Sequence, residues 1–453
     1  MKKALLLSVV ASSMIMAGGD IAPVEPVVET PAPVVSGWEF SGTGVVYYQT
    51  NDLVPGTVAT LHGATGGDLF DQDTSAADAG IQLRAMNADV IAGIGAGVEV
   101  SGLATLGLEN WMVSDVMQST GNGAGVLGGT NDVDDVTDGG WISQAYLTYG
   151  FGNTSIKAGR QELPKALSPF AFSEDWNVFK NTFDAVLVVN SDLPDTTLVG
   201  AWVYGANYNA MGVLSPVGNA IPSVNPLFLN NLTDFNSLND DRGVWMLTVQ
   251  NKSIANLTLT GSWYYANEFI TTDDLNVLWG DAQYDASSFN VGIQGGTVMH
   301  DAFPHDDIVA FGAKVGAELA GAHLMAAYSN VNDGGLMGAA AGMFNIGGTT
   351  SALYTDLLSD QLGNFPLHGI TRFDMDKFVV KGHMDALGGT ISAAYGYTDF
   401  GAWDGDLNEF NVGYGINITD GLNVNAAYAY VSADTAPVDE DVNVVRVIAT
   451  YNF

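Results

Sequence analysis

The chain ends in the stretch Val442-Asn-Val-Val-Arg-Val-Ile-Ala-Thr-Tyr-Asn-Phe453, in which every second residue from Val445 to Phe453 is apolar. A period of two predicts a β-strand with one apolar and one polar face. An exposed apolar strand is a rare end for a soluble domain. It is typical of an outer-membrane β-barrel, whose last strand closes against the first. We therefore expect Phe453 to take part in barrel closure and the barrel-assembly machinery to act on this strand.

The composition supports a membrane barrel. The 453 residues include 55 Gly and no Cys, and charged residues are 14% of the chain, against roughly 25% in soluble domains. Apolar residues are 47%, yet beyond the N-terminus there is no run of about 20 that would predict a membrane-spanning helix. A secreted acidic β-sandwich or β-helix is the alternative. The net charge of -36 excludes nucleic acid as a partner and favours cations near the protein.

The N-terminus predicts export. Residues 1–17 have two lysines, an apolar run and small residues before a cleavage site, as in a Sec signal peptide. Residues 18–37 contain four prolines, which predict an extended periplasmic lead-in rather than a helix or sheet. Residues 38–453 are then the barrel. We expect the protein in the outer membrane of a Gram-negative cell, in contact with outer-membrane lipid.

Period-two alternation between Gly, Asp and Asn residues marks eighteen candidate strands of an antiparallel, all-β barrel, although sixteen strands stay open. Most have the length that a tilted strand needs to cross a bilayer. The predicted strands are 38–49, 79–90, 97–109, 141–151, 154–161, 183–190, 196–207, 243–251, 255–266, 275–284, 288–299, 307–319, 322–331, 375–386, 389–399, 406–417, 422–433 and 442–453.

The connections between these strands alternate in length. Short turns, such as 152–153 and 320–321, alternate with other connections, several of which are long: 50–78, 110–140, 162–182, 208–242 and 332–374. Short periplasmic turns and long extracellular loops are the asymmetry of a bacterial barrel. Both termini then lie on the periplasmic side.

Charge placement predicts which face of each strand meets lipid. In 307–319, Val309, Phe311 and Val315 oppose Lys314 and Glu318. A Lys or Arg on the lipid face near mid-membrane costs about 2–4 kcal/mol, so strand charges belong in the lumen. Aromatic residues at strand ends predict the interfacial girdles: Trp38, Tyr149, Phe151, Tyr395, Tyr397, Tyr428, Tyr430 and Tyr451.

The connection 161–182 is too apolar and aromatic for a loop in water. We expect it to fold into the lumen and narrow the pore, with Glu162, Glu174 and Asp175 facing basic residues of the wall; an outward loop is the alternative. Opposed charges across a constriction orient and sort small polar solutes. The face of Arg160 is uncertain, because it shares parity with Ile156 and Ala158. The predicted constriction residues are Arg84, Lys157, Arg160, Glu162, Lys165, Glu174, Asp175, Lys180, Lys314, Lys381 and Arg446.

Cofactor chemistry is weakly indicated. Acidic runs at 132–138, 240–241 and 439–441 are rich in oxygen ligands, so calcium is left open, but their spacing matches no EF-hand and solvated loop charge is the favoured interpretation. His300 and His305 stand beside aspartates and leave a metal site open. No GxSxG, SxxK or HExxH motif occurs, so the sequence predicts no enzyme and no cofactor.

Several segments carry a family resemblance. Residues 143–149 (SQAYLTY) followed by 155–163 (SIKAGRQEL) resemble the strand-turn-strand of Campylobacter-type major outer-membrane porins, which are loosely related to the OprD-like specific channels. The likeness continues through 183–190, 198–204 and 445–453. It implies an eighteen-stranded barrel, often a homotrimer, that passes small cations and nutrients. It also implies that Arg160 matches a basic position at the start of the constriction loop, and that some relatives hold calcium in the pore.

The functional expectation is an outer-membrane porin that passes small hydrophilic solutes and ions by passive diffusion, with a preference for cations. The alternative is a surface adhesion or structural protein that acts through its long loops, which the Gly-rich stretch 331–372 motivates.

Overall fold

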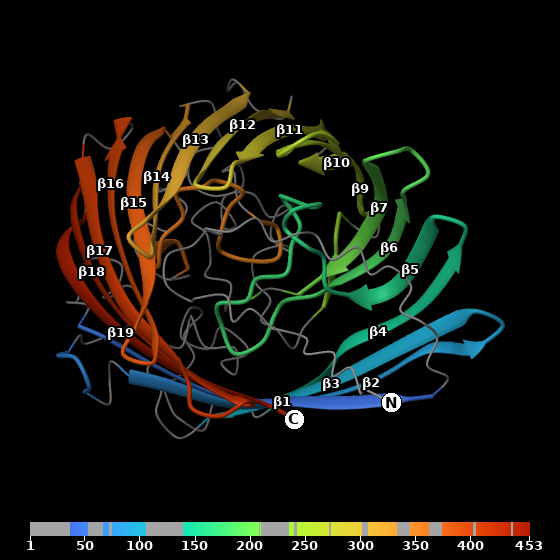
Figure 1. The fold of residues 1–453 in the computed structure, drawn as a ribbon, viewed down its shortest axis with the longest axis horizontal. Coiled ribbons are helices and arrows are strands. Elements are labelled where there is room, and N and C mark those ends of the chain that lie inside the picture. Colours follow the sequence, from blue (N-terminus) through green and yellow to red (C-terminus); the bar gives the residue numbers. More distant parts are fainter. Residues whose placement is uncertain are drawn as a thin grey trace.

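The computed structural model describes residues 37–52, 67–71, 75–105, 139–207, 209, 235–239, 242–270, 273–300, 307–332, 345–361, 374–401, 405–435 and 438–453. The strands among these residues form one closed antiparallel sheet that runs in sequence order around a barrel (Figure 1). The predicted signal peptide and almost all of the predicted lead-in, up to residue 36, lie outside the described residues.

Eighteen long strands make up the wall, and the two-residue β8 (Asn236–Ser237) extends the end of β7. The strands are β1 (Glu39–Asn51), β2 (Ser75–Ile91), β3 (Ile94–Thr105), β4 (Gly139–Phe151), β5 (Thr154–Gln161), β6 (Phe183–Asn190), β7 (Thr196–Ala206), β9 (Val244–Ile254), β10 (Leu257–Ile270), β11 (Asp273–Asp285), β12 (Phe289–His300), β13 (Ile308–Leu319), β14 (Ala322–Val331), β15 (Met375–Ala386), β16 (Gly389–Phe400), β17 (Gly405–Asn417), β18 (Leu422–Thr435) and β19 (Val438–Asn452).

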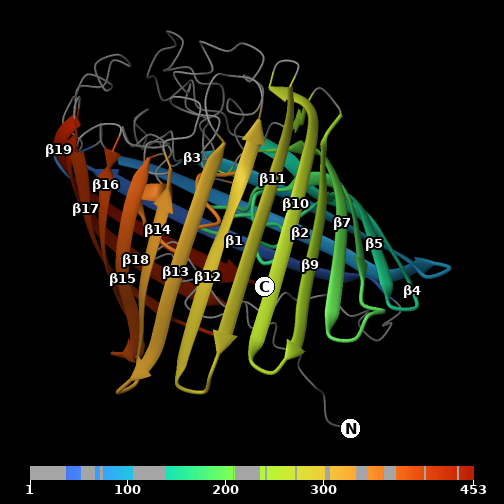
Figure 2. The same ribbon diagram turned by 90° about the horizontal axis from the view of Figure 1, so that it is seen from above.

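The predicted strand pattern is confirmed. Each of the eighteen candidates coincides with a long strand, and the bounds of β5, β6, β14 and β15 match the prediction to the residue. The short turns lie together at one end of the barrel (Figure 2). In three of them, at 92–93, 320–321 and 387–388, both turn residues have positive φ, and Gly is the second. Such mirror-image turns fit the twist of the adjoining strands.

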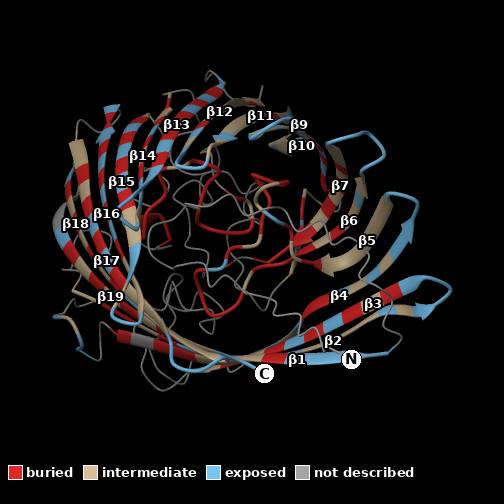
Figure 3. Cartoon of the chain, viewed as in Figure 1, coloured by how far each residue is buried: buried red, intermediate tan, exposed pale blue. Residues whose placement is uncertain are grey.

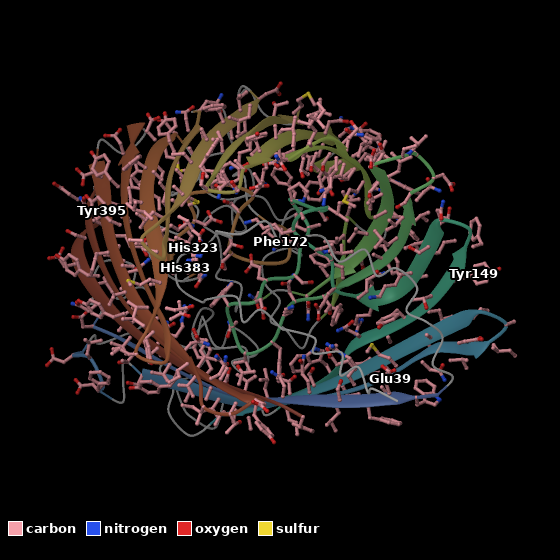
Figure 4. The ribbon with its side chains drawn as sticks, viewed as in Figure 1. Glu39, Tyr149, Phe172, His323, His383 and Tyr395 are labelled. Atoms are coloured by element: carbon pink, nitrogen blue, oxygen red, sulfur yellow. The ribbon has the colours of Figure 1, made fainter. Side chains whose placement is uncertain are left out.

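The two faces of the sheet differ in chemistry as predicted. On β13, Val309, Phe311 and Val315 are about half exposed on the outside, whereas Lys314 is buried within the barrel. Burial alternates along the strands in this way around the ring (Figure 3). Tyr149 and Tyr395 point outward (Figure 4). So large an apolar exterior needs lipid rather than water around it. None of the described helical residues forms a helix long and apolar enough to cross a membrane.

The barrel closes between β1 and β19, which pair from Thr43↔Asn452 to Asn51↔Val444. Beyond the last strand residue, Gly42 and Phe453 exchange two backbone hydrogen bonds of 2.8 and 2.9 Å. The Phe453 ring lies over Gly42, where an added Cβ would come within 2.4 Å of the ring. The prediction that Phe453 takes part in closure agrees with this geometry.

Gly42→Val is expected to displace the Phe453 ring and weaken the closing pair. Heat-modifiable migration of the refolded protein would then be lost at a temperature several degrees lower than in the wild type. Gly44→Val is the matched control, because nothing lies within 4 Å of a Cβ at Gly44. Equal loss in both variants would contradict the role of the ring.

Candidate functional site

The first inward segment is 162–182, between β5 and β6, and it lies inside the ring of strands (Figure 1). Its aromatic residues are buried, and Phe172 sits within the lumen (Figure 4). Phe170 packs edge-on against Tyr264 and Trp279 of β10 and β11, with ring centroids 5.6 and 5.4 Å apart. Phe179 packs against Trp141 of β4 at 6.1 Å. The segment therefore crosses the lumen between distant walls.

A second inward segment, 345–361, comes from the connection between β14 and β15. It includes the 3-10 turn η4 (Ser359–Gln361), and Leu353, Leu357 and Leu358 are buried in it. The side-chain amide of Asn345 accepts a hydrogen bond from the Phe172 backbone N–H and donates one to the Phe172 carbonyl, at 2.9 and 2.7 Å. The expectation that 332–374 is wholly an outer loop is wrong for these residues, because their leucines need a buried surface.

Glu174 joins the two segments. Its carboxylate is 3% exposed and accepts hydrogen bonds of 2.6 to 3.2 Å from Trp176 Nε1, Asn209 Nδ2, Asn345 Nδ2, the backbone N–H groups of Thr349 and Thr350, and Thr350 Oγ1. All of these donors are neutral. The expectation that Glu174 faces a basic wall residue is therefore wrong. Hydrogen bonds from neutral donors to a carboxylate are stronger than those between two neutral groups, so these six bonds satisfy Glu174 without a cation.

A first charged cluster lies where 162–182 meets β2 and β3. Arg84 donates from Nε to Glu99 Oε2 at 2.8 Å and lies 3.7 Å from Glu162. Lys180 Nζ lies 3.3 Å from Glu162 and 3.7 Å from Asp175. Four of the predicted constriction residues therefore lie in this cluster: Arg84, Glu162, Asp175 and Lys180. A fifth, Lys157, lies 3.9 Å from the centre of the Tyr146 ring, and its positive charge also acts on Glu162.

The charges of this cluster hold one another ionised. Burial opposes ionisation of Glu162, but the positive charges of Lys180, Arg84 and Lys157 outweigh it and lower the pKa of Glu162. The Glu162 carboxylate in turn raises the pKa of Lys180 above its ordinary value, with Asp175 adding to the effect. The cluster therefore keeps a fixed pattern of charge at neutral pH.

A second charged cluster lies where 345–361 meets β13, β15, β17 and β19. Lys377 Nζ donates to Asp360 at 2.6 Å with both side chains buried, and Glu409 accepts from the Ser359 backbone N–H at 3.0 Å. Lys314 Nζ lies 4.4 Å from the Tyr354 ring. Lys381 is buried near Asp356, with Lys165 and Lys314 among its neighbouring cations. Arg446 Nη1 donates to Gln361 at 2.7 Å.

Arg160 lies elsewhere. It follows the outward parity of Ile156 and Ala158, and it forms a two-pronged ion pair at 2.9 and 3.0 Å with Asp184, which is directly opposite on β6. Its Nη1 also donates to the Ile142 carbonyl at 2.8 Å. Its prediction as a lumen residue is wrong. The paired carboxylate and the position at the strand end remove the cost that would exclude an unpaired arginine from the outer face.

Sequence reasoning missed several lumen residues of the second cluster. Asp281 and Glu409 lie on strands, and the period-two pattern places both on the lumen face. The sequence alone was therefore sufficient to identify them. Tyr354, Asp356, Asp360 and Gln361 were not detectable from it, because nothing local shows that their loop turns inward. No group of three His, Asp or Glu among the described residues has metal-site geometry. The acidic runs at 132–138 and 240–241, and residues 301–306 beside His300, lie outside the described residues.

The fold has many solved counterparts. No protein-family model matches the chain, and no curated protein matches its sequence. OccK8 (OprE) of Pseudomonas aeruginosa has a TM-score of 0.63 and 16% identity, over 93% of this chain and 99% of its own. OpdK of the same organism, solved with vanillate, has a TM-score of 0.65 and 13% identity, over 93% and 100%. OccAB2 of Acinetobacter baumannii has a TM-score of 0.62 and 13% identity, over 92% and 98%.

Glu174→Ala is expected to release 345–361 from 162–182, because it leaves several buried donors without an acceptor, at about 1–3 kcal/mol each. Hydrogen exchange of 345–361 would rise at least tenfold, while exchange in the barrel strands would not change. Asp175→Ala is the control, since Asp175 is an exposed acid on the same segment. The same rise in both variants would disprove the joining role of Glu174.

The Glu162–Lys180 pair is expected to be insensitive to pH around neutrality. With the pKa of Glu162 lowered, its stabilising effect is complete above the ordinary glutamate pKa of about 4.3 and is lost as pH falls through the lowered value. With the pKa of Lys180 raised, its effect is lost only at strongly alkaline pH. The difference in thermal midpoint between wild type and Glu162→Gln should be constant from about pH 5 to 9. A midpoint difference that changes near pH 7 would contradict this.

The chain therefore has the barrel fold of these OccK and Opd proteins, and two of its connections fold into the lumen beside two charged clusters.

Proposed function

We propose that the protein is an outer-membrane porin through which small hydrophilic solutes and ions diffuse passively, with a preference for cations. The observation that carries the proposal is the contrast between an apolar outer surface and a lumen lined by ionised groups and narrowed by two inward segments. A barrel of this strand number is too wide for wall side chains alone to fill. A lumen lined by ionised groups favours the passage of polar solutes and ions over apolar ones.

Two further observations support the proposal. The structural neighbours are OccK- and OprD-type porins, and one of them was solved with vanillate bound. The chain has 50 acidic and 14 basic residues, and this excess of negative charge favours cations at the mouth of the pore. The resemblance to Campylobacter-type porins and the homotrimer stay predictions, as do calcium binding, Sec export and recognition by the barrel-assembly machinery.

The inward position of 345–361 weakens the adhesion alternative for this loop. Residues that are buried against β15 and β17 cannot contact another cell.

The test is single-channel current in a planar bilayer under a tenfold KCl gradient. Stepwise openings with a reversal potential on the cation side, and potassium several-fold more permeant than chloride, are expected. Glu162→Gln should reduce this ratio, because it removes a lumen carboxylate. Asp192→Asn in a periplasmic turn is the matched control and should not change it. An anion-side reversal potential would overturn the cation preference, and silence from correctly folded protein would overturn the channel.

A further inference from the structure

Two histidines face each other on the lumen wall near the end of the barrel that carries the short turns. His323 of β14 lies two residues after the turn at 320–321, directly opposite His383 of β15. Both share the parity of buried lumen residues, such as Met325 and Lys381. Their rings are stacked, with centroids 4.7 Å apart and planes 19° apart. Figure 4 shows the pair on the inner side of the wall. Two imidazoles are therefore presented to the same part of the lumen.

Glu318 of β13 extends the pair into a row across three neighbouring strands, because it lies directly opposite His323. Its Oε1 lies 3.4 Å from His323 Nε2. An ordinary N–H···O hydrogen bond is shorter, at about 2.7–3.2 Å. Two ligands that are each about 2.0–2.1 Å from one tetrahedral zinc ion lie about 3.3 Å from each other. The carboxylate and the imidazole therefore have the spacing of two neighbouring metal ligands.

The ring of His383 is available to a ligand. In the described part of the chain, no side-chain hydrogen bond holds either of its nitrogens. Asp385 lies two residues further along β15 on the same face, so carboxylates stand on both sides of the histidines. Lys381 lies two residues in the other direction, where it is buried near Asp356. The place thus combines two imidazoles with two carboxylates in a chain whose net charge is -36, which favours a cation.

We propose that His323 and His383 bind a divalent transition-metal ion of the zinc, nickel or copper class, with Glu318 as the third protein ligand and water in the remaining position. Neutral imidazole is a nitrogen ligand that suits these ions. Calcium and magnesium prefer a shell of oxygen ligands, which this row does not supply. None of the three ligands belongs to either charged cluster, and the site does not depend on the protein being a channel.

Metal binding needs one local movement. The rings are nearly parallel, so a metal in the plane of one lies outside the plane of the other, and none of the described residues form a finished three-ligand site. Rotation of His323 about its side-chain bonds removes this mismatch, and its side chain, which is 46% exposed, has the space to turn. A bound ion then joins β13, β14 and β15 near their turns. Because the unfolded chain does not hold the three ligands together, stability rises with metal concentration by mass action.

The first experiment titrates zinc chloride into the refolded wild-type protein in a calorimeter, with excess calcium chloride present to fill sites made of oxygen ligands alone. One zinc site per chain that calcium does not displace is expected. Loss of even an outer partner of a metal ligand costs about 10- to 100-fold in metal affinity. His323→Gln and His383→Gln should therefore each raise the dissociation constant at least about tenfold.

Ser392→Ala is the matched control. Ser392 lies directly opposite His383 on β16, in the same row, and it is neither an imidazole nor a carboxylate. Its variant should bind zinc as the wild type does. Absence of a calcium-resistant site in the wild type would overturn the proposal, as would unchanged zinc affinity in either histidine variant.

The second experiment does not depend on a variant that folds. Crystals of the wild-type protein grown with zinc chloride are measured at the zinc absorption edge. An anomalous peak at about 2.0–2.1 Å from a ring nitrogen of both His323 and His383 supports the site. A peak that contacts only one of the two rings, or no peak beside them, overturns the proposal whatever the calorimeter shows.

Discussion

The structure depends on one constraint, which is that no backbone N–H or C=O group within the membrane can be left without a hydrogen bond. A sheet meets it only when its two edge strands pair with each other. Here that pairing is between β1 and β19, and it extends past the last strand residue to the two backbone bonds between Gly42 and Phe453. The even number of long strands follows from closure, because every strand of the ring is antiparallel to both of its neighbours.

Closure creates a second problem, because a ring of this size encloses more space than its wall side chains fill. The chain solves it with two connections that turn inward, each with its own apolar residues. The segments need a polar partner as well, since their backbone groups leave water. Glu174 is that partner, and it collects donors from both segments at one carboxylate. The shape of the lumen is therefore set by the contact between segments and not by the wall alone.

The sequence predicts the wall almost completely and the lumen only in part. Strands are local objects, and a period of two places Lys314 and Val315 on opposite faces without knowledge of anything distant. The same rule leaves the face of Arg160 uncertain, because parity points outward while the strand end allows a turn into the pore; Asp184, the partner that stabilises Arg160 on the outer face, is 24 residues away. The inward turn of 345–361 and the neutral donors around Glu174 depend on contacts up to 176 residues apart, which no local pattern encodes.

The path of 162–182 also has a mechanical consequence. A wide ring of strands resists stretching around its circumference far better than flattening, because flattening only bends the sheet. Phe170 bears on β10 and β11, while Phe179 bears against Trp141 of β4 and lies over Gly80 of β2. The segment thus connects β10 and β11 with β2 and β4, which are far apart in sequence and lie on different sides of the ring. It fixes the cross-section of the barrel under lateral pressure from the membrane, so the aperture keeps its shape when the surrounding lipid does not.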